Sequence, residues 1–151
     1  MNNKLFFIEI CIVIMLLGTG CNGVGKHPIP DVPVYLDINI TRDAPELNAL
    51  GGYKEFIEPT NINQALGYGG IIIIRTFEDA MCAFDLSCPH EASPTVRLIP
   101  DNVGQARCSV CQTVFNIGYG TGFAVSGIAR FPLKQYAVNW SYSTGNITVY
   151  N

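Results

Sequence analysis

The stretch GGIIIIRTFEDAMCAFDLSCPH, residues 69–90, is the part of the sequence that says most about the fold. Its four consecutive isoleucines, at 71–74, predict a strand buried on both faces, because a half-exposed strand alternates apolar and polar residues. Residues 78–80 favour a turn, and residues 81–86 then follow a period of two, which predicts a second, antiparallel strand. We therefore expect a strand–turn–strand unit that leads into a Cys-Pro-His loop at 88–90.

Short strands are predicted on both sides of this unit. Residues 32–40 (VPVYLDINI) alternate between apolar and polar side chains and predict a half-buried strand. Residues 95–99 and 105–108 predict a hairpin around the turn sequence PDNVG. The other segments with strand character are 53–57, 113–117, 122–126, 136–141 and 146–151. Because no segment predicts a helix longer than a turn or two, the expected fold class is all-β, an antiparallel sandwich or barrel.

Two pairs of potential metal ligands flank the predicted hairpin. Cys88 and His90 are separated by one proline, which stiffens the loop, and Cys108 and Cys111 are separated by two residues, the spacing of a thiolate knuckle. Seventeen residues, 91–107, lie between the pairs, enough for one hairpin. Thiolates and an imidazole suit soft or borderline metal ions, so the spacing predicts that two neighbouring loops hold one metal centre.

This arrangement resembles the Rieske iron–sulfur family, in which a Cys-x-His loop and a Cys-x-x-His loop are separated by a similar interval. Residues 69–90 look like the family's strand–turn–strand unit before the first cluster loop, and CSVCQTVFN at 108–116 is similar to the second loop. GIARFPLKQYAV at 127–138 resembles the family's closing segment. The resemblance implies a Rieske-like antiparallel β-sandwich or barrel with a small cluster-binding subdomain in residues 82–116.

Carried over position by position, the resemblance implies a [2Fe–2S] cluster held by four side chains. Cys88 and Cys108 match the thiolates on the buried iron, and His90 matches one imidazole on the outer iron. Cys111 stands where the family has its second histidine. Thr113 takes the place of a serine, a position from which a hydroxyl can hydrogen-bond a cluster sulfur.

The departures from the family pattern change the expected chemistry. A thiolate in place of a neutral imidazole adds negative charge, which disfavours uptake of an electron and moves the reduction potential toward that of all-cysteine clusters. The loop that covers the cluster in the family also differs, since its proline is Ile128 here.

Two alternatives to the cluster stay open. Three cysteines and one histidine also form a good tetrahedral zinc site. In an exported protein, an even number of thiols could instead form disulfides. The remaining thiol, Cys82, lies on the core-facing side of its strand and is expected to be an inert buried residue.

The first residues resemble the signal of a bacterial lipoprotein. Lys4 precedes an apolar run at 10–17, which is too short to span a bilayer because a spanning helix takes about 20 residues. Small residues at 18–20 lead to Cys21, which implies removal of residues 1–20 and attachment of a lipid to the Cys21 thiol.

A Gly/Pro-rich segment follows the predicted cleavage site. Residues 21–31 are expected to form a flexible tether, and residues 32–151 a single Rieske-like domain long enough to bury a core. The protein is then expected to be exported and anchored to a membrane, facing the periplasm or the cell surface.

Composition narrows the possible partners. The net charge is −3 at pH 7 without a cluster of Lys or Arg, so electrostatics favour no nucleic-acid binding. Neither a second cofactor motif nor a nucleophile–base pair accompanies the cysteines. The sequence therefore predicts an electron carrier or redox sensor with an unknown redox partner protein, rather than a complete enzyme. The alternative function is a binding module on a zinc-bound or metal-free scaffold.

Overall fold

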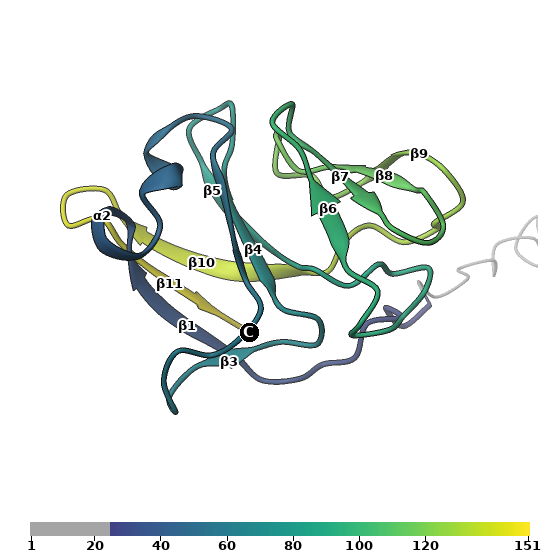
Figure 1. The fold of residues 1–151 in the computed structure, drawn as a ribbon, viewed down its shortest axis with the longest axis horizontal. Coiled ribbons are helices and arrows are strands. Elements are labelled where there is room, and N and C mark those ends of the chain that lie inside the picture. The colour runs from purple at the N-terminus through teal and green to yellow at the C-terminus, as the bar shows by residue number, and fades with distance from the viewer. Residues whose placement is uncertain (1–24) are drawn as a thin grey trace, which may run out of the picture.

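The computed structural model describes residues 25–151, which form an all-β fold of two antiparallel sheets (Figure 1). The larger sheet has seven strands in the order β2-β4-β5-β10-β11-β1-β3. These strands are β1 (Val34–Asn39), β2 (Tyr53–Phe56), β3 (Ala65–Leu66), β4 (Ile71–Arg75), β5 (Met81–Asp85), β10 (Gln135–Ser141) and β11 (Asn146–Tyr150). The predicted fold class is confirmed, although β3 lies in a polar stretch where no strand was expected.

The smaller sheet has four strands in the order β6-β7-β8-β9 and lies beside the larger sheet in Figure 1. Its strands are β6 (Leu98–Pro100), β7 (Gln105–Cys108), β8 (Val114–Asn116) and β9 (Ala124–Ser126). Along the chain this sheet is inserted between β5 and β10, which are paired neighbours in the larger sheet. It spans residues 98–126 and overlaps residues 82–116, for which a cluster-binding subdomain stays a prediction.

Helical structure is limited to two short segments within residues 25–151. These are α2 (Ile40–Asp43) and the 3-10 helix η1 (Pro45–Asn48), of four residues each. The side-chain oxygen of Asn39 caps α2 by accepting a hydrogen bond from the N–H of Thr41 at 3.1 Å. In the described part of the chain, no helix has the length and apolar character needed to cross a bilayer.

The isoleucine run of β4 separates two hydrophobic cores. All four isoleucines are fully buried. Ile71 and Ile73 pack in one core with side chains of β1, β5 and β11, whereas Ile72 and Ile74 pack in the other with residues around the cysteine loops. The predicted strand buried on both faces is therefore confirmed. Burial of each isoleucine stabilises the fold by about 1.5–3 kcal/mol, so β4 ties the two sheets together.

The predicted turn after β4 sets the register of β5. The N–H of Thr76 donates to the carbonyl oxygen of Ala80 at 2.8 Å, and Asp79 has a φ of 63°. Aspartate tolerates this left-handed conformation better than most residues, and Arg75 Nε donates to Asp79 Oδ1 at 2.7 Å. The register pairs Ile71 with Asp85, so the chain beyond Asp85 continues past the end of β4 toward the cysteine loop.

The described part of the predicted tether packs against the domain. Ile29 is 1% exposed, and Nε2 of His27 lies 3.0 Å from the carbonyl oxygen of Pro132. Lys134 Nζ donates to the carbonyl oxygen of Pro30 at 2.8 Å. These residues are therefore held in place, which differs from a flexible tether over 21–31. The predicted signal 1–20 and Cys21 lie outside the described residues.

Candidate metal centre

Cys88 is positioned by a loop that follows β5. Its N–H donates to the carbonyl oxygen of Val96 at 3.2 Å, and its own carbonyl oxygen accepts from the N–H of Ala92 at 2.9 Å. A β-bridge between Ser87 and Arg97 closes the base of the loop. The side chain of Cys88 is fully buried and belongs to the core that β4 shares with the smaller sheet.

Cys108 ends β7, and Cys111 follows in the tight turn that leads to β8. The N–H of Cys108 donates to the carbonyl oxygen of Thr113 at 2.9 Å, which closes this turn. Gln112 has a φ of 59°, and its side-chain amide donates to the carbonyl oxygen of Ser109 at 2.9 Å. Cys108 is buried and Cys111 half-buried, so the turn directs one thiol inward and the other toward the surface.

The two loops bring three thiols together. The sulfurs of Cys88, Cys108 and Cys111 all lie within 4.8 Å of one another, and those of Cys88 and Cys111 are 3.6 Å apart. All four cysteines of the described chain, including Cys82, are free thiols. A tetrahedral ion with thiolate ligands at about 2.3 Å holds their sulfurs about 3.8 Å apart. The separation of Cys88 and Cys111 is therefore close to that of two ligands of one ion.

The thiols differ in how readily they ionise. Burial raises the pKa of Cys88 to about 12, although hydrogen bonds from the backbone N–H groups of Glu91 and His90 act in the opposite direction. Burial also opposes ionisation of Cys111, but hydrogen bonds with Thr113 and the two other thiols outweigh burial and lower the pKa of Cys111. Cys111 is therefore converted more easily than Cys88 to the thiolate that metal ions bind.

Thr113 joins the second loop to the segment that covers it. Its side chain is buried, and its hydroxyl oxygen accepts from the N–H groups of Ile128 at 3.1 Å and Ala129 at 3.2 Å. The same oxygen lies 3.3 Å from the sulfur of Cys111. The backbone of Gly127 packs directly against Thr113. Gly127 has a φ of 106°, and a Cβ added to it would clash with Thr113 Cα at 2.5 Å. The sequence predicted that this hydroxyl could hydrogen-bond a cluster sulfur, which stays a prediction; in the structure it lies beside the sulfur of Cys111.

His90 lies outside the group of three thiols. Its side chain is exposed, and its ring nitrogens are not among the ligand atoms that lie within 4.8 Å of one another. His90 instead lines a hollow of about 440 Å³. The other residues that line this hollow are Pro28, Pro89, Ile128, Arg130 and Phe131. The structure thus brings together three of the four predicted ligands, and His90 as a ligand stays a prediction.

The buried carboxylate of Asp85 forms a hydrogen-bond network next to the first loop. Asp85 is fully buried, and its oxygens accept from the N–H of Ser87 at 2.7 Å, the N–H of Tyr68 at 2.8 Å and the hydroxyl of Tyr136 at 2.6 Å. The N–H of Gly69 also donates to it at 3.2 Å. Because Ser87 immediately precedes Cys88, this network helps fix the position of the first cysteine. Its partner Tyr136 lies 51 positions further along the chain, so the local sequence around Asp85 does not reveal this contact.

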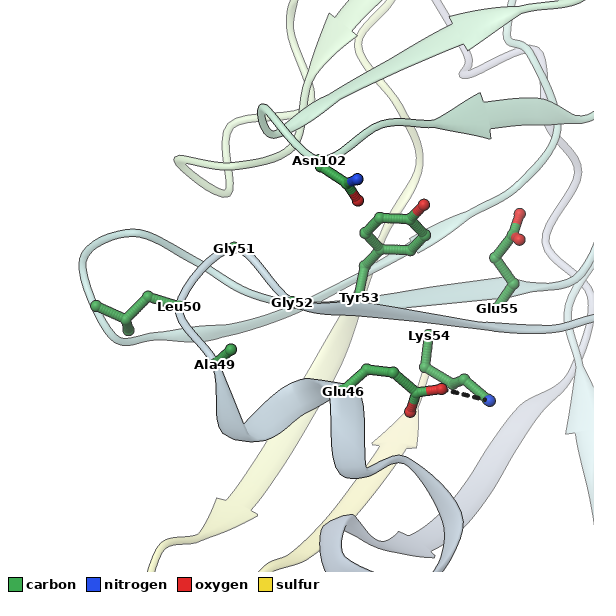
Figure 2. A pocket seen from close by; sticks show the side chains of 9 residues that line it. All are labelled: Glu46, Ala49, Leu50, Gly51, Gly52, Tyr53, Lys54, Glu55 and Asn102. Carbon is green, nitrogen blue, oxygen red and sulfur yellow. Dashed lines mark hydrogen bonds and ion pairs between the residues drawn. The ribbon is translucent and has the colours of Figure 1, made fainter.

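A larger hollow lies apart from the cysteines and carries no metal-binding set. It has a volume of about 570 Å³, and Figure 2 shows Tyr53 and Asn102 on one side of it and the Glu46–Lys54 ion pair near η1. That ion pair has an N–O distance of 2.9 Å. The residues that line the hollow include no cysteine or histidine, so the thiol group remains the strongest candidate for chemistry.

No protein-family model matches the chain, and no curated protein matches it. Solved structures with related folds do exist. A chain of the complex of reduced oxygenase and oxidized ferredoxin in carbazole 1,9a-dioxygenase is 17% identical, with a TM-score of 0.47 over 76% of this chain and 99% of that chain. The putative NADH-dependent nitrite reductase small subunit from Mycobacterium tuberculosis is 11% identical, with a TM-score of 0.44 over 80% of this chain and 97% of that chain.

A third solved structure has a higher TM-score. The quaternary ammonium Rieske monooxygenase CntA is 15% identical, with a TM-score of 0.52. The match covers 79% of this chain and 31% of the monooxygenase, so it concerns one part of that enzyme. At this identity the likeness concerns the fold alone. It shows that the chain has a Rieske-like β fold, as the resemblance implied.

Proposed function

We propose that this chain is an electron carrier that binds a [2Fe–2S] cluster through Cys88, His90, Cys108 and Cys111. The observation that supports the proposal is the convergence of three free thiols from two loops of a Rieske-like fold. Thiolates are the donors that iron–sulfur clusters require, and an imidazole can replace a thiolate on one iron. His90 is exposed and follows Cys88 by two residues in the same loop, so the proposal requires its ring to turn toward the thiols when the cluster binds.

The residues around the thiols would limit the access of water to such a centre and stabilise negative charge on its sulfur ligands. When bound, the cluster supplies reversible one-electron transfer. Cys88 and Cys108 keep their sulfurs away from water because both side chains are buried. The hydroxyl of Thr113 accepts two backbone hydrogen bonds, so its own proton is free to point at the Cys111 sulfur 3.3 Å away. That hydrogen bond stabilises negative charge on the sulfur when Cys111 is a thiolate.

One observation favours a second candidate function. The sulfurs of Cys88 and Cys111 are in contact at 3.6 Å, which suits ligands of a single ion better than ligands of two irons separated by bridging sulfides. A zinc ion held by the three thiolates and a fourth donor would stiffen the two loops. The domain would then act as a binding module without electron transfer.

Metal content and spectroscopy separate the two candidates. The full chain is expressed with ample iron, purified without oxygen, and assayed for iron, zinc and acid-labile sulfide. The electron-carrier proposal predicts two irons and two sulfides per chain, visible absorption, and a paramagnetic resonance signal after reduction. Zinc without sulfide would overturn that proposal and support the structural candidate.

We also infer that the chain is exported and anchored through a lipid on Cys21. The support is the order of Lys4, the apolar run 10–17 and the small residues at 18–20 before Cys21. Replacing Cys21 with serine is expected to release the protein from the membrane fraction and to prevent the mass shift caused by a lipid. Retention of the Cys21→Ser protein in membranes would contradict the anchor.

A further inference from the structure

The described chain begins beside the candidate metal centre. Gly25 lies against Phe131, because a Cβ added to Gly25 would lie 3.7 Å from the ring of Phe131. Pro28 lines the same hollow as His90 and Ile128. The N-terminal segment therefore joins the domain at the end that carries the cysteine loops.

Several contacts hold this segment in place. The His27 ring accepts a hydrogen bond at Nδ1 from the N–H of Ile29 at 3.1 Å, so its Nε2 donates to the carbonyl oxygen of Pro132 at 3.0 Å. The ring also packs edge-on against Phe131 with a centroid distance of 5.8 Å. Ile29 is buried, and Lys134 Nζ donates to its carbonyl oxygen at 3.3 Å. The position of Gly25 relative to the loops is thus fixed by the fold.

The same end of the domain presents apolar and basic side chains to solvent. Ile128 is 60% exposed, and Val110, in the turn between Cys108 and Cys111, is 58% exposed. Lys26 and Arg130 are exposed as well. Exposed apolar side chains flanked by cations suit a surface of anionic lipids, where the cations lie near the headgroups and the apolar groups lie deeper. We refer to these four residues as the Ile128 surface.

We propose that the Ile128 surface lies on the membrane to which Cys21 attaches the chain. The proposal rests on the inferred lipid anchor. Four residue steps separate Cys21 from Gly25, which corresponds to at most about 14 Å of extended chain. A lipid on Cys21 would therefore hold Gly25, and the end of the domain fixed to it, close to the headgroups. A redox partner that reaches the centre from the His90 side would then be bound to, or dissolved in, the same membrane.

The single tryptophan, Trp140, provides a control at the other end of the domain. It pairs with Ile147 in the β10–β11 hairpin, and Figure 1 shows the turn of that hairpin and the N-terminal segment at opposite ends of the molecule. A variant that combines Ile128→Trp with Trp140→Phe moves the fluorophore to the Ile128 surface. Both full-length proteins, lipid-modified by the host, are reconstituted in vesicles of phosphatidylcholine and phosphatidylglycerol with and without brominated acyl chains.

Quenching by brominated lipid reports contact with the bilayer. We expect a large loss of fluorescence for Ile128→Trp/Trp140→Phe and little loss for the wild-type protein, with the unbrominated vesicles correcting for quenching within the protein. Val110→Trp/Trp140→Phe provides a second reporter if the first variant does not fold, and the same loss is expected. Equal quenching at the two ends, or stronger quenching of Trp140, would overturn the proposal while leaving the anchor intact. Failure of the wild-type protein to remain with the vesicles would instead overturn the anchor itself and, with it, this orientation.

Discussion

The sulfur of Cys111 lies 3.6 Å from the sulfur of Cys88, although the two residues are 23 positions apart in the sequence. In the arrangement implied by the Rieske resemblance, these two residues bind different irons. Here their sulfurs touch, and the hydroxyl of Thr113 lies on the other side of Cys111. Cys111 is therefore the residue whose replacement best separates the hypotheses about the metal.

Replacement of Cys111 by histidine restores the ligand pattern of the family. If a [2Fe–2S] cluster is present, Cys111→His is expected to keep its iron and to raise the reduction potential, because a neutral ligand replaces an anionic one. The change should move the potential toward the range of roughly −150 to +300 mV found for centres with two histidines. Voltammetry of both proteins measures it.

Cys82→Ala is the matched control for this experiment. Cys82 is free and half-buried but lies outside the group of three thiols, and burial raises its pKa. Its replacement is expected to leave metal content and potential unchanged. A lower potential in Cys111→His than in the wild-type protein would contradict the assignment of Cys111 as an anionic ligand.

Thr113→Val is expected to destabilise the second loop. The substitution keeps the shape of the side chain but leaves the N–H groups of Ile128 and Ala129 without their acceptor. The free energy of unfolding should fall by about 1–3 kcal/mol, measured by urea denaturation. Thr41→Val, at an exposed position of α2, serves as the control and should change stability much less. Equal effects of the two substitutions would show that the Thr113 hydroxyl does not support the loop.

Tyr136→Phe is expected to weaken the network under the first loop. It removes the hydroxyl that donates to the buried Asp85 carboxylate at 2.6 Å. Loss of a hydrogen bond to a charged group costs about 1.5–3 kcal/mol of unfolding free energy, which denaturation at pH 7 would measure. Tyr150→Phe is the control, because Tyr150 is exposed at the end of β11. A difference below the error of the two curves would contradict a stabilising role for this contact.

The same tyrosine predicts a loss of stability in alkaline solution. Burial, and then the hydrogen bond to Asp85, raise the pKa of Tyr136 far above its ordinary value of 10. The unfolded chain releases this proton first, so the stability due to the neutral phenol is complete below pH 10 and falls as the pH rises further. The wild-type unfolding free energy should therefore fall more steeply than that of Tyr136→Phe between about pH 9.5 and 11. Parallel curves for the two proteins would contradict the raised pKa.

Ile73→Ala tests the role of β4 in the fold. Ile73 is fully buried in the core of the larger sheet, and removal of its side chain leaves a cavity there. We expect a loss of about 2–5 kcal/mol in unfolding free energy, measured by urea denaturation. Ile99→Ala provides the comparison. Ile99 is exposed on β6, so its replacement should lower the unfolding free energy far less. Similar losses at both positions would mean that β4 does not hold the cores together.

Some features of the site depended on contacts that no sequence pattern indicates. Asp85 ends β5 and is fully buried, and its partner Tyr136 comes from β10, 51 positions further along the chain. The Gly/Pro-rich composition of residues 21–31 suggested a tether, yet His27 reaches Pro132 across 105 residues. Such contacts form only when the whole sheet has folded, so composition within a short window says nothing about them.

The sequence by itself determined the all-β class, the double burial of the isoleucine strand, and the two loops that carry the cysteines. These depend on local periodicity and turn residues, which act over a few positions of the chain. The tertiary structure decided that the Cys111 sulfur contacts Cys88, that His90 faces outward, and that the N-terminal segment joins the same end of the domain. Those outcomes depend on how the two sheets pack and on which side of each loop is buried. The spacing of the ligands along the sequence determines neither the packing nor the burial.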